Sequence, residues 1–351
     1  MKKFLSILLA LAMVLALAAC GASEPAPAAT EAPKAEAPAA TEAPAAPAEK
    51  ELITVGFAQV GHESDWRMAN TADYQAVFSV ENGYDLMFVD CDNDNAVQIE
   101  AVRTSIQQGV DYIVLAPIQS AGWESVLQEA KDAGIPVIVA DRQVDAPAEM
   151  YDAFLGTDTH VEGVAAGNWL AEYLNGEPAK ILEIYGTIGA SAAIGRAEGF
   201  REIAADHPEW EILDSQSGDF TQTGGQEVME SFLKTYDDFN VVYCHNDNEA
   251  YGAMDAMDAA GITYGVDGDV IIISFDATHD GLQYTLDGKI HCNVECNPLQ
   301  VQYVSDIIQM MEAGEEFPTY TLVKDEAFVA PGIESAYAIT MTQEILDGRA
   351  Y

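Results

Sequence analysis

Carboxylate, amide and arginine side chains recur at one kind of position in this chain, directly after short apolar runs. An Asp-Arg pair, Asp141 and Arg142, follows one such run, and Asp276 follows another. Carboxylate and amide oxygens accept hydroxyl protons, whereas the arginine fork and the Asn amide donate to hydroxyl and ring oxygens. These groups together suit a neutral, hydroxyl-rich ligand. The candidate binding residues are Glu63, Trp66, Arg67, Asp92, Asp141, Arg142, Arg196, Asn246, Asp276 and Glu295.

Each of these side chains also has a purely structural explanation. Asp and Asn cap helices and stabilise turns, so a single acidic residue after a strand carries little weight. The ring of Trp66 could cover the apolar C–H face of a sugar, or it could belong to the core. Arg142 and Arg196 carry more weight because the whole chain has only 15 lysine and arginine residues.

The apolar runs themselves predict an α/β fold. They are rich in Val, Ile, Leu and Phe, as buried parallel strands are, and amphipathic stretches separate them. We expect strands at 54–60, 86–91, 112–116, 137–140, 153–156, 180–185, 211–216, 241–244, 270–275 and 291–296. We expect helices at 65–82, 96–108, 122–133, 160–174, 190–205, 223–235, 249–260, 280–286, 298–313 and 333–346.

This alternation indicates two Rossmann-like, doubly wound parallel-sheet lobes in tandem, hinged around a central cleft. In such open sheets, ligands bind beyond the carboxyl ends of the strands. Two lobes that face each other therefore place the polar strand ends in one cleft, which is the usual location of a small-molecule site.

The first 50 residues predict export rather than a fold. A basic head at Lys2 and Lys3, an apolar run at 4–16 and a small-residue ending are typical of a signal peptide over residues 1–19. The ending Leu-Ala-Ala-Cys-Gly resembles a bacterial lipobox, which predicts lipidation of Cys20. Residues 20–50 are an Ala-, Pro- and Glu-rich stretch, interpreted as a disordered stalk. We expect a lipid-anchored, extracytoplasmic (or periplasmic) protein.

Charge and cysteine content exclude several functions. A formal net charge of −43 argues against nucleic acid as a partner, because phosphate binding needs a basic face. We expect no metal and no cofactor: the spacing of His291, Cys292 and Cys296 matches no zinc pattern. The acidic triplet that begins at Asp90 lacks the glycine and final glutamate of a calcium loop. Four cysteines follow the leader: Cys91, Cys244, Cys292 and Cys296. We expect most of them to be free, buried thiols, and whether any pair forms is left open.

Several longer stretches point to a family. They include Val55-Gly56-Phe57-Ala58-Gln59-Val60-Gly61, Ser64-Asp65-Trp66-Arg67, Asp141-Arg142, Ser215-Gln216-Ser217-Gly218-Asp219-Phe220-Thr221 and His245-Asn246-Asp247. Through them, residues 54–331 resemble the periplasmic sugar-binding proteins of bacterial ABC importers, in the ribose-binding branch of the type I class, and most of all its galactofuranose-binding members. The resemblance departs at Asp65, Gly195 and Cys296.

The resemblance implies a monomer that captures a monosaccharide, such as galactofuranose, galactose or a ribose-like sugar, for an ABC permease in the membrane. It carries the binding role onto Trp66 with Glu63 and Arg67, onto Asp141 with Arg142, and onto Arg196, Asn246 and Asp276. We expect an N-terminal lobe of residues 51–157 plus 297–322 and a C-terminal lobe of residues 158–296 plus 323–351.

Alternative functions remain open at this point. A sugar-sensing lipoprotein that serves a chemoreceptor or sensor kinase would have the same sequence features. A secreted hydrolase would use Ser191 with Asp247 and His279, although Ala193 breaks the nucleophile-elbow motif. A transcription repressor on the same core would need a DNA-binding module where this chain has its leader and acidic stalk.

Overall fold

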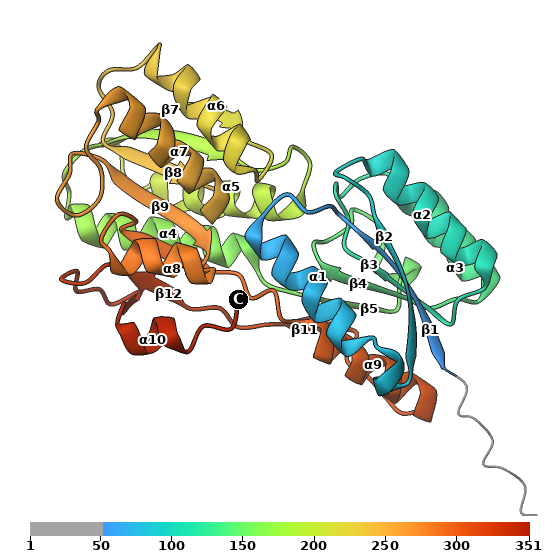
Figure 1. Ribbon diagram of the computed structural model, residues 1–351. Helices are drawn as coiled ribbons and strands as arrows, with labels where there is room; N and C mark the ends of the chain where they lie inside the picture. The colour runs from blue at the N-terminus through green and yellow to red at the C-terminus, as the bar shows by residue number, and fades with distance from the viewer. Residues whose placement is uncertain (1–51) are drawn as a thin grey trace, which may run out of the picture. The chain divides into compact units, whose positions relative to one another are not determined.

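Runs of branched and aromatic apolar residues form the strands of two separate sheets in the computed structural model, which describes residues 52–351 (Figure 1). The first sheet has the order β11-β5-β4-β3-β1-β2, and all its neighbouring strands are parallel. Its strands are β1 (Ile53–Gln59), β2 (Tyr84–Asp90), β3 (Tyr112–Leu115), β4 (Val137–Asp141), β5 (Ala153–Gly156) and β11 (Tyr320–Leu322).

The second sheet has the order β13-β12-β10-β9-β8-β6-β7. It is parallel except where β12 runs antiparallel to β10. Its strands are β6 (Ala179–Tyr185), β7 (Trp210–Ser217), β8 (Val241–Cys244), β9 (Ile271–Asp276), β10 (Cys292–Glu295), β12 (Ala327–Val329) and β13 (Ile339–Thr340).

Helices alternate with the strands of both sheets, as parallel pairing requires. The helices of the first lobe are α1 (Asp65–Val77), α2 (Asn95–Gln108), α3 (Glu124–Ala133) and α9 (Val301–Ala313), with short 3₁₀ turns at Val80–Asn82 and Ala148–Met150. Those of the second lobe are α4 (Thr159–Leu174), α5 (Ser191–Ala204), α6 (Gln222–Leu233), α7 (Asp247–Ala260), α8 (His279–Leu286) and α10 (Gln343–Asp347).

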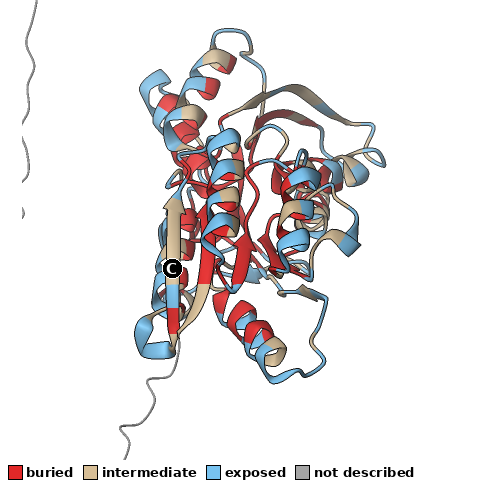
Figure 2. Cartoon of the chain, turned by 90° about the vertical axis from the view of Figure 1, so that its right-hand side faces the viewer, coloured by how far each residue is buried: buried red, intermediate tan, exposed pale blue. Residues whose placement is uncertain are grey.

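Burial is concentrated in the central strands and on one side of most helices, as Figure 2 shows in red. In the first lobe, Phe57 of β1 stacks on Tyr74 of α1 with ring centroids 3.6 Å apart. In the second lobe, Phe200 of α5 stacks on Tyr243 of β8 at 4.2 Å. Such aromatic pairs fix each helix against its sheet, and thereby fix the loops at the strand ends.

Side-chain caps set where the helices nearest the cleft begin. The Ser64 hydroxyl accepts a hydrogen bond from Arg67 N at 3.1 Å and starts α1, and Asn246 Oδ1 accepts from Glu249 N at 2.8 Å and starts α7. Each cap satisfies a backbone N–H that has no partner inside the helix. The polar strand ends are therefore held on short, tightly capped connections.

The chain passes between the two sheets three times within the described residues. It leaves the first sheet after β5 for α4, returns from β10 to α9, and leaves again between β11 and β12. The backbone of Glu295 donates to Glu326 O at 2.7 Å, so the second and third passages lie side by side. These passages are the positions at which the lobes can hinge.

The two-sheet α/β architecture agrees with the sequence-based expectation, but the end of the chain does not. The helix expected at 333–346 is wrong: only Gln343–Asp347 is helical, and Ile339–Thr340 pairs with β12 as strand β13. Thr342 caps α10 by accepting from Ile345 N, which starts the helix late. The preceding segment is held instead by Glu172 of α4, which accepts from Ser335 Oγ and Ala336 N.

One smaller difference concerns a helix end. The helix expected at 65–82 ends at Val77 and is followed by the 3₁₀ turn Val80–Asn82.

The signal peptide predicted for 1–19, the lipidation of Cys20 and the stalk predicted for 20–50 lie outside the described residues. Among the helices within 52–351, none has both the length and the apolar character that a bilayer crossing requires.

Candidate functional site

A small cavity lies where the strand ends of the two lobes meet. The space between its atoms is about 300 Å³, part of which is open to solvent. Both lobes contribute, and charged side chains dominate the walls. The lining residues are Glu63, Ser64, Trp66, Arg67, Asp141, Arg142, Ala192, Arg196, Phe220, Asn246, Asp276 and Cys296.

In the first lobe, Arg67 holds two carboxylates in place. Its Nη2 donates to Asp141 Oδ2 at 2.9 Å and its Nε donates to Glu63 Oε1 at 3.1 Å. Its Nη1 reaches the side-chain oxygens of Gln59 and Asn70 at 3.3 and 3.4 Å. Burial alone would lower the pKa of the Arg67 guanidinium, but the nearby carboxylates raise it above its ordinary value. Arg67 is therefore a charged and fully engaged support.

Arg142 is buried like Arg67 but has few partners. Its hydrogen bond in the described structure is a long one, from Nη1 to Ile118 O at 3.4 Å. Its ion-pair distances to Glu63 and Asp141 are 3.8 and 3.9 Å, beyond hydrogen-bonding range. Burial, and then the neighbouring Arg67, lower the pKa of Arg142. Its guanidinium thus lines the cavity with donors to spare, and it lies 5.1 Å from the ring centre of Phe220.

In the second lobe, one arginine is shared between two carboxylates. Arg196 Nε donates to Glu162 Oε2 at 2.7 Å, Nη2 donates to Asp276 Oδ1 at 3.2 Å, and Nη1 donates to His245 O. Desolvation raises the pKa of Asp276 to about 8, although Arg196 opposes the rise. At neutral pH the Asp276 carboxyl is therefore partly protonated, and it can donate as well as accept.

Sharp backbone turns aim several of these groups at the cavity. Asp141, Phe220 and Asp276 have positive φ angles of 64°, 60° and 95°. Residues other than glycine adopt such angles rarely, and they cluster at functional sites. The Phe220 carbonyl also accepts from Asn246 Nδ2 at 3.0 Å, which orients the amide that caps α7.

Trp66 bridges the lobes. Its indole Nε1 donates to Cys296 O at 2.5 Å, from α1 of the first lobe to the passage that follows β10 of the second. The Arg67 guanidinium lies 4.6 Å from its ring centre. The side chain is buried yet lines the cavity, so it is not an ordinary core residue.

Two of the ten candidates do not reach the cavity, and we withdraw them as binding residues. Asp92 is exposed in the turn before α2, and Asp94 instead caps that helix through Ala96 N. Glu295 is buried, but its carboxylate accepts from Tyr351 Oη, Arg349 Nη1 and Glu326 N. A strand-end position does not determine the face to which a side chain points, because successive side chains alternate.

The sequence-based list missed residues of two kinds. Phe220 directly follows the Gly-Asp after β7, so the strand-end rule that found the others also reaches it. Glu162 lies on α4, away from any strand end, and acts by holding Arg196 and the Thr157 hydroxyl. Nothing in its sequence position marks it.

The hydrolase hypothesis is wrong. Ser191 Oγ accepts from Gln143 N at 2.8 Å, across the cleft. Asp247 is buried and accepts hydrogen bonds from Ser274, Thr278 and Asn293 at 2.6–2.9 Å. These residues therefore hold the structure together rather than form a catalytic triad.

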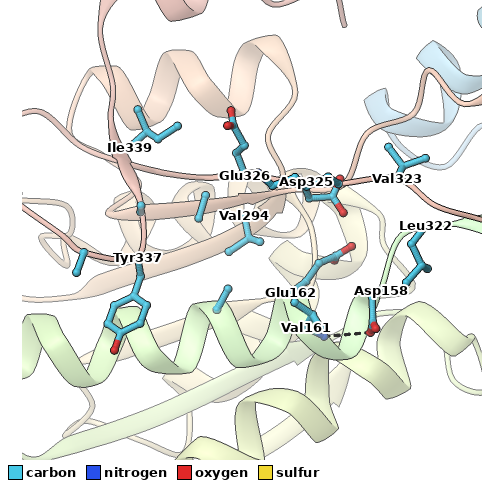
Figure 3. A pocket seen from close by; sticks show the side chains of 15 residues that line it. Asp158, Val161, Glu162, Val294, Leu322, Val323, Asp325, Glu326, Tyr337 and Ile339 are labelled. Carbon is cyan, nitrogen blue, oxygen red and sulfur yellow. Dashed lines mark hydrogen bonds between the residues drawn. The ribbon is translucent and has the colours of Figure 1, made fainter.

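A second, larger cavity lies between α4 and the β11–β12 passage, with about 1280 Å³ of space between its atoms, part of which is open to solvent. Figure 3 shows Val161, Val294, Leu322, Val323 and Ile339 among its walls. Carboxylates are also present, but no arginine or amide side chain converges with them. A hydroxyl-rich ligand needs such convergent donors and acceptors, so the smaller cavity is the better candidate site.

The cysteines are free and buried, as expected, at positions 91, 244, 292 and 296. Burial raises the pKa of the Cys296 thiol well above its ordinary value, which keeps it protonated and unreactive. In the part of the chain that the structure describes, no group of three or more His, Cys, Asp or Glu is arranged to hold a metal ion.

Two α/β sheets around a charged cavity define a two-lobed binding protein, and comparison with known families agrees. The family described as "Periplasmic binding protein domain" matches residues 14–314. This chain belongs to that family, which confirms the resemblance inferred from the sequence.

Individual relatives give more detail. The galactofuranose-binding protein YtfQ of Escherichia coli is 38% identical over 282 residues, covering 79% of this chain and 88% of the relative. A Mycobacterium smegmatis structure in complex with β-D-fucofuranose is 45% identical with a TM-score of 0.76, covering 79% and 91% of the two chains. The arabinose-transporter binding protein of Shewanella sp. ANA-3, bound to L-arabinofuranose, is 37% identical with a TM-score of 0.75 and the same coverage. These relatives are sugar-binding proteins rather than enzymes.

Proposed function

We propose that this protein binds a monosaccharide in its five-membered-ring form in the small cavity and delivers it to an ABC importer. All three relatives described above are named for, or bound to, a furanose sugar. The eight cavity residues predicted from the sequence are the proposed ligand-binding set: Glu63, Trp66, Arg67, Asp141, Arg142, Arg196, Asn246 and Asp276.

One observation carries the proposal: Arg142 is a buried guanidinium with a single long hydrogen bond. A buried charge that lacks partners is costly, so the folded protein gains when a ligand supplies acceptors. Sugar hydroxyl and ring oxygens are suitable acceptors, and Phe220 nearby provides an apolar surface for C–H groups. Glu63 adds a buried Oε2 without a hydrogen-bond partner among the described residues.

Closure of the two lobes would trap the sugar. The lobes touch directly through Ser120 N, which donates to Gly189 O at 2.8 Å, and through Asp65 N, which donates to Asn248 Oδ1 at 3.0 Å. A sugar that bonds to both lobes selects this closed arrangement over an open one. The importer can then distinguish loaded from empty protein by shape.

The remaining features of the proposal concern the chain outside the cavity. We place the lobe boundaries at 157/158, 296/297 and 322/323, consistent with the sheet to which each strand belongs. We further propose that the protein is a monomer tethered to the outer face of the membrane through lipidated Cys20. A role in sugar sensing would use the same site.

The test is a thermal-shift and calorimetry screen of the 51–351 fragment. Anhydroalditols with a locked ring distinguish ring sizes: 1,4-anhydrogalactitol is furanoid and 1,5-anhydrogalactitol is pyranoid. We expect arabinose, galactose, fucose or ribose to raise the melting temperature, and the furanoid analogue to bind more tightly than the pyranoid one. Binding of only the pyranoid analogue would overturn the ring-size proposal, and no shift with any sugar would overturn sugar binding.

A further inference from the structure

Glu295 has no place in the cavity, but its surroundings give it a specific task. Both carboxylate oxygens are occupied: Oε1 accepts from Tyr351 Oη at 2.7 Å and from Arg349 Nη1, and Oε2 accepts from Glu326 N at 3.1 Å. The side chains of Glu295 and Arg349 are about nine-tenths buried. The Arg349 guanidinium also lies over the Phe328 ring, 5.2 Å from its centre.

These contacts fasten one particular junction. Glu295 is the last residue of β10, and the next residue, Cys296, begins the second passage between the lobes. Its own N–H donates to Glu326 O at 2.7 Å, on the third passage. Main-chain and side-chain bonds of one residue therefore tie two passages to each other, and the side chains of Arg349 and Tyr351 complete the tie.

The residue that follows Glu295 supplies the hydrogen-bond acceptor for the Trp66 indole. Cys296 O, one peptide unit beyond Glu295, accepts the indole N–H at 2.5 Å. An indole has only one N–H, so this bond decides how its ring is placed in the cavity wall. A shift of the Cys296 carbonyl would turn or release the ring.

We propose that Glu295, held by Arg349 and Tyr351, is a positioning residue that fixes the Cys296 carbonyl and through it the Trp66 ring. This inference rests on the proposed sugar-binding function of the cavity. The C-terminal segment then contributes to sugar affinity without touching the sugar, through a chain of contacts from Arg349 and Tyr351 to Glu295, Cys296 and Trp66.

A double-mutant cycle tests the coupling. Glu295→Ala should weaken sugar binding about tenfold in the wild-type background and less than about twofold in Trp66→Phe, because phenylalanine has no N–H for the Cys296 carbonyl. The sugar used is the one that binds the wild type most tightly in the screen above. Equal losses in both backgrounds would overturn the proposal.

A spectroscopic readout needs no sugar. The Trp66 contribution to fluorescence, taken as the difference between each protein and its Trp66→Phe counterpart, should change in wavelength or intensity in Glu295→Ala. Tyr351→Phe should give a smaller change in the same direction, and it serves as the test if Glu295→Ala does not fold. An unchanged Trp66 signal in both variants would overturn the proposal even if sugar binding itself fails to appear.

Glu172→Ala is the matched control. Glu172 fastens the same C-terminal region to α4 through Ser335 Oγ and Ala336 N, but it does not contact the Glu295 junction. It should leave the affinity and the Trp66 signal unchanged. A Glu172→Ala effect equal to that of Glu295→Ala would show general loosening of the C-terminal region instead of positioning, and would overturn the proposal.

Discussion

The two halves of the cavity use arginine in opposite ways. In the second lobe, Arg196 is shared by Glu162 and Asp276, so two carboxylates surround one cation. In the first lobe, Glu63 and Asp141 are held mainly by Arg67, which leaves Arg142 as an additional, under-bonded cation. The first half is balanced in charge, whereas the second has more acidic groups than cations. Burial of the Asp276 carboxyl, and then the neighbouring carboxylates, raise its pKa.

The difference separates support from recognition. Arg67 and Arg196 line the proposed binding cavity but also hold buried carboxylates, so their loss should cost stability as well as affinity. Arg142 makes few hydrogen bonds within the protein, so its loss should cost affinity but not stability. Buried arginines in one cavity thus serve two purposes. The number of hydrogen bonds that each arginine makes within the protein distinguishes the two purposes. Variants at each position can test this comparison.

The largest effect is expected for Arg196→Met. Loss of the Arg196 guanidinium leaves Glu162 and Asp276 buried without their cation, which should lower the free energy of unfolding by about 3–5 kcal/mol. Urea denaturation measures the change. The control is Arg103→Met, which removes a partly exposed arginine paired with Glu129 and should cost about 1 kcal/mol or less. Similar losses for both variants would contradict a supporting role for Arg196.

Arg142→Ala should have the opposite consequence, a loss of sugar affinity without a loss of stability. Sugar affinity should fall by about 100-fold or more, since at least two charge-assisted hydrogen bonds are lost. The sugar-free protein should be as stable as the wild type or more so, because an under-bonded buried charge is gone. Calorimetry measures the sugar affinity, and denaturation measures the free energy of unfolding of the sugar-free protein. Wild-type affinity, or a large loss of stability, would place Arg142 with the supporting arginines.

Trp66→Phe should have an intermediate effect. The variant loses the indole bond to Cys296 O and part of the ring surface, so affinity should fall about three- to tenfold. Wild-type protein should also change its tryptophan fluorescence when the sugar is added, and Trp66→Phe should not. Trp210→Phe is the control, because Trp210 packs against Phe200 and His207 and does not line the cavity.

The last prediction concerns the pH dependence of the free energy of unfolding. The pKa of Asp276 lies at about 8 in the folded protein and at its ordinary 3.8 when unfolded, so unfolding between these values releases a proton. Its contribution to stability is therefore lost as pH rises from about 4 to 8. Asp276→Asn should make the decline shallower, while Asp267→Asn, at an exposed site, should not. Denaturation midpoints at pH 5 and pH 8 measure the difference. Parallel declines in wild type and Asp276→Asn would contradict this assignment.

Much of the architecture could be predicted from the sequence, because buried parallel strands have a clear apolar signature. Arg142, Asn246 and Asp276, which the strand-end rule selected, line one cavity. It failed at Glu295, whose side chain points away from the cavity although its neighbour Cys296 lines it. It also could not find Glu162, which acts from a helix through Arg196, because such a role depends on tertiary contacts.

The C-terminal region was the least predictable part of the fold. Residues 333–346 have helix-compatible residues, but Ile339 pairs with Phe328 and Thr342 starts the helix late. Tertiary pairing with a strand that had itself not been predicted outweighed local preference here. A short edge strand of two or three residues has too little pattern to be recognised in advance.

The threading of the chain has a consequence for how the protein matures. The core of the first lobe includes Val304 and Ile308 of α9, and its sheet ends with β11 at Tyr320–Leu322. The sheet of the second lobe needs β12 and β13 near the end of the chain. Neither core is complete while the chain is still emerging from the ribosome or a translocation channel. Both lobes therefore reach their complete packing only after these late segments have joined them.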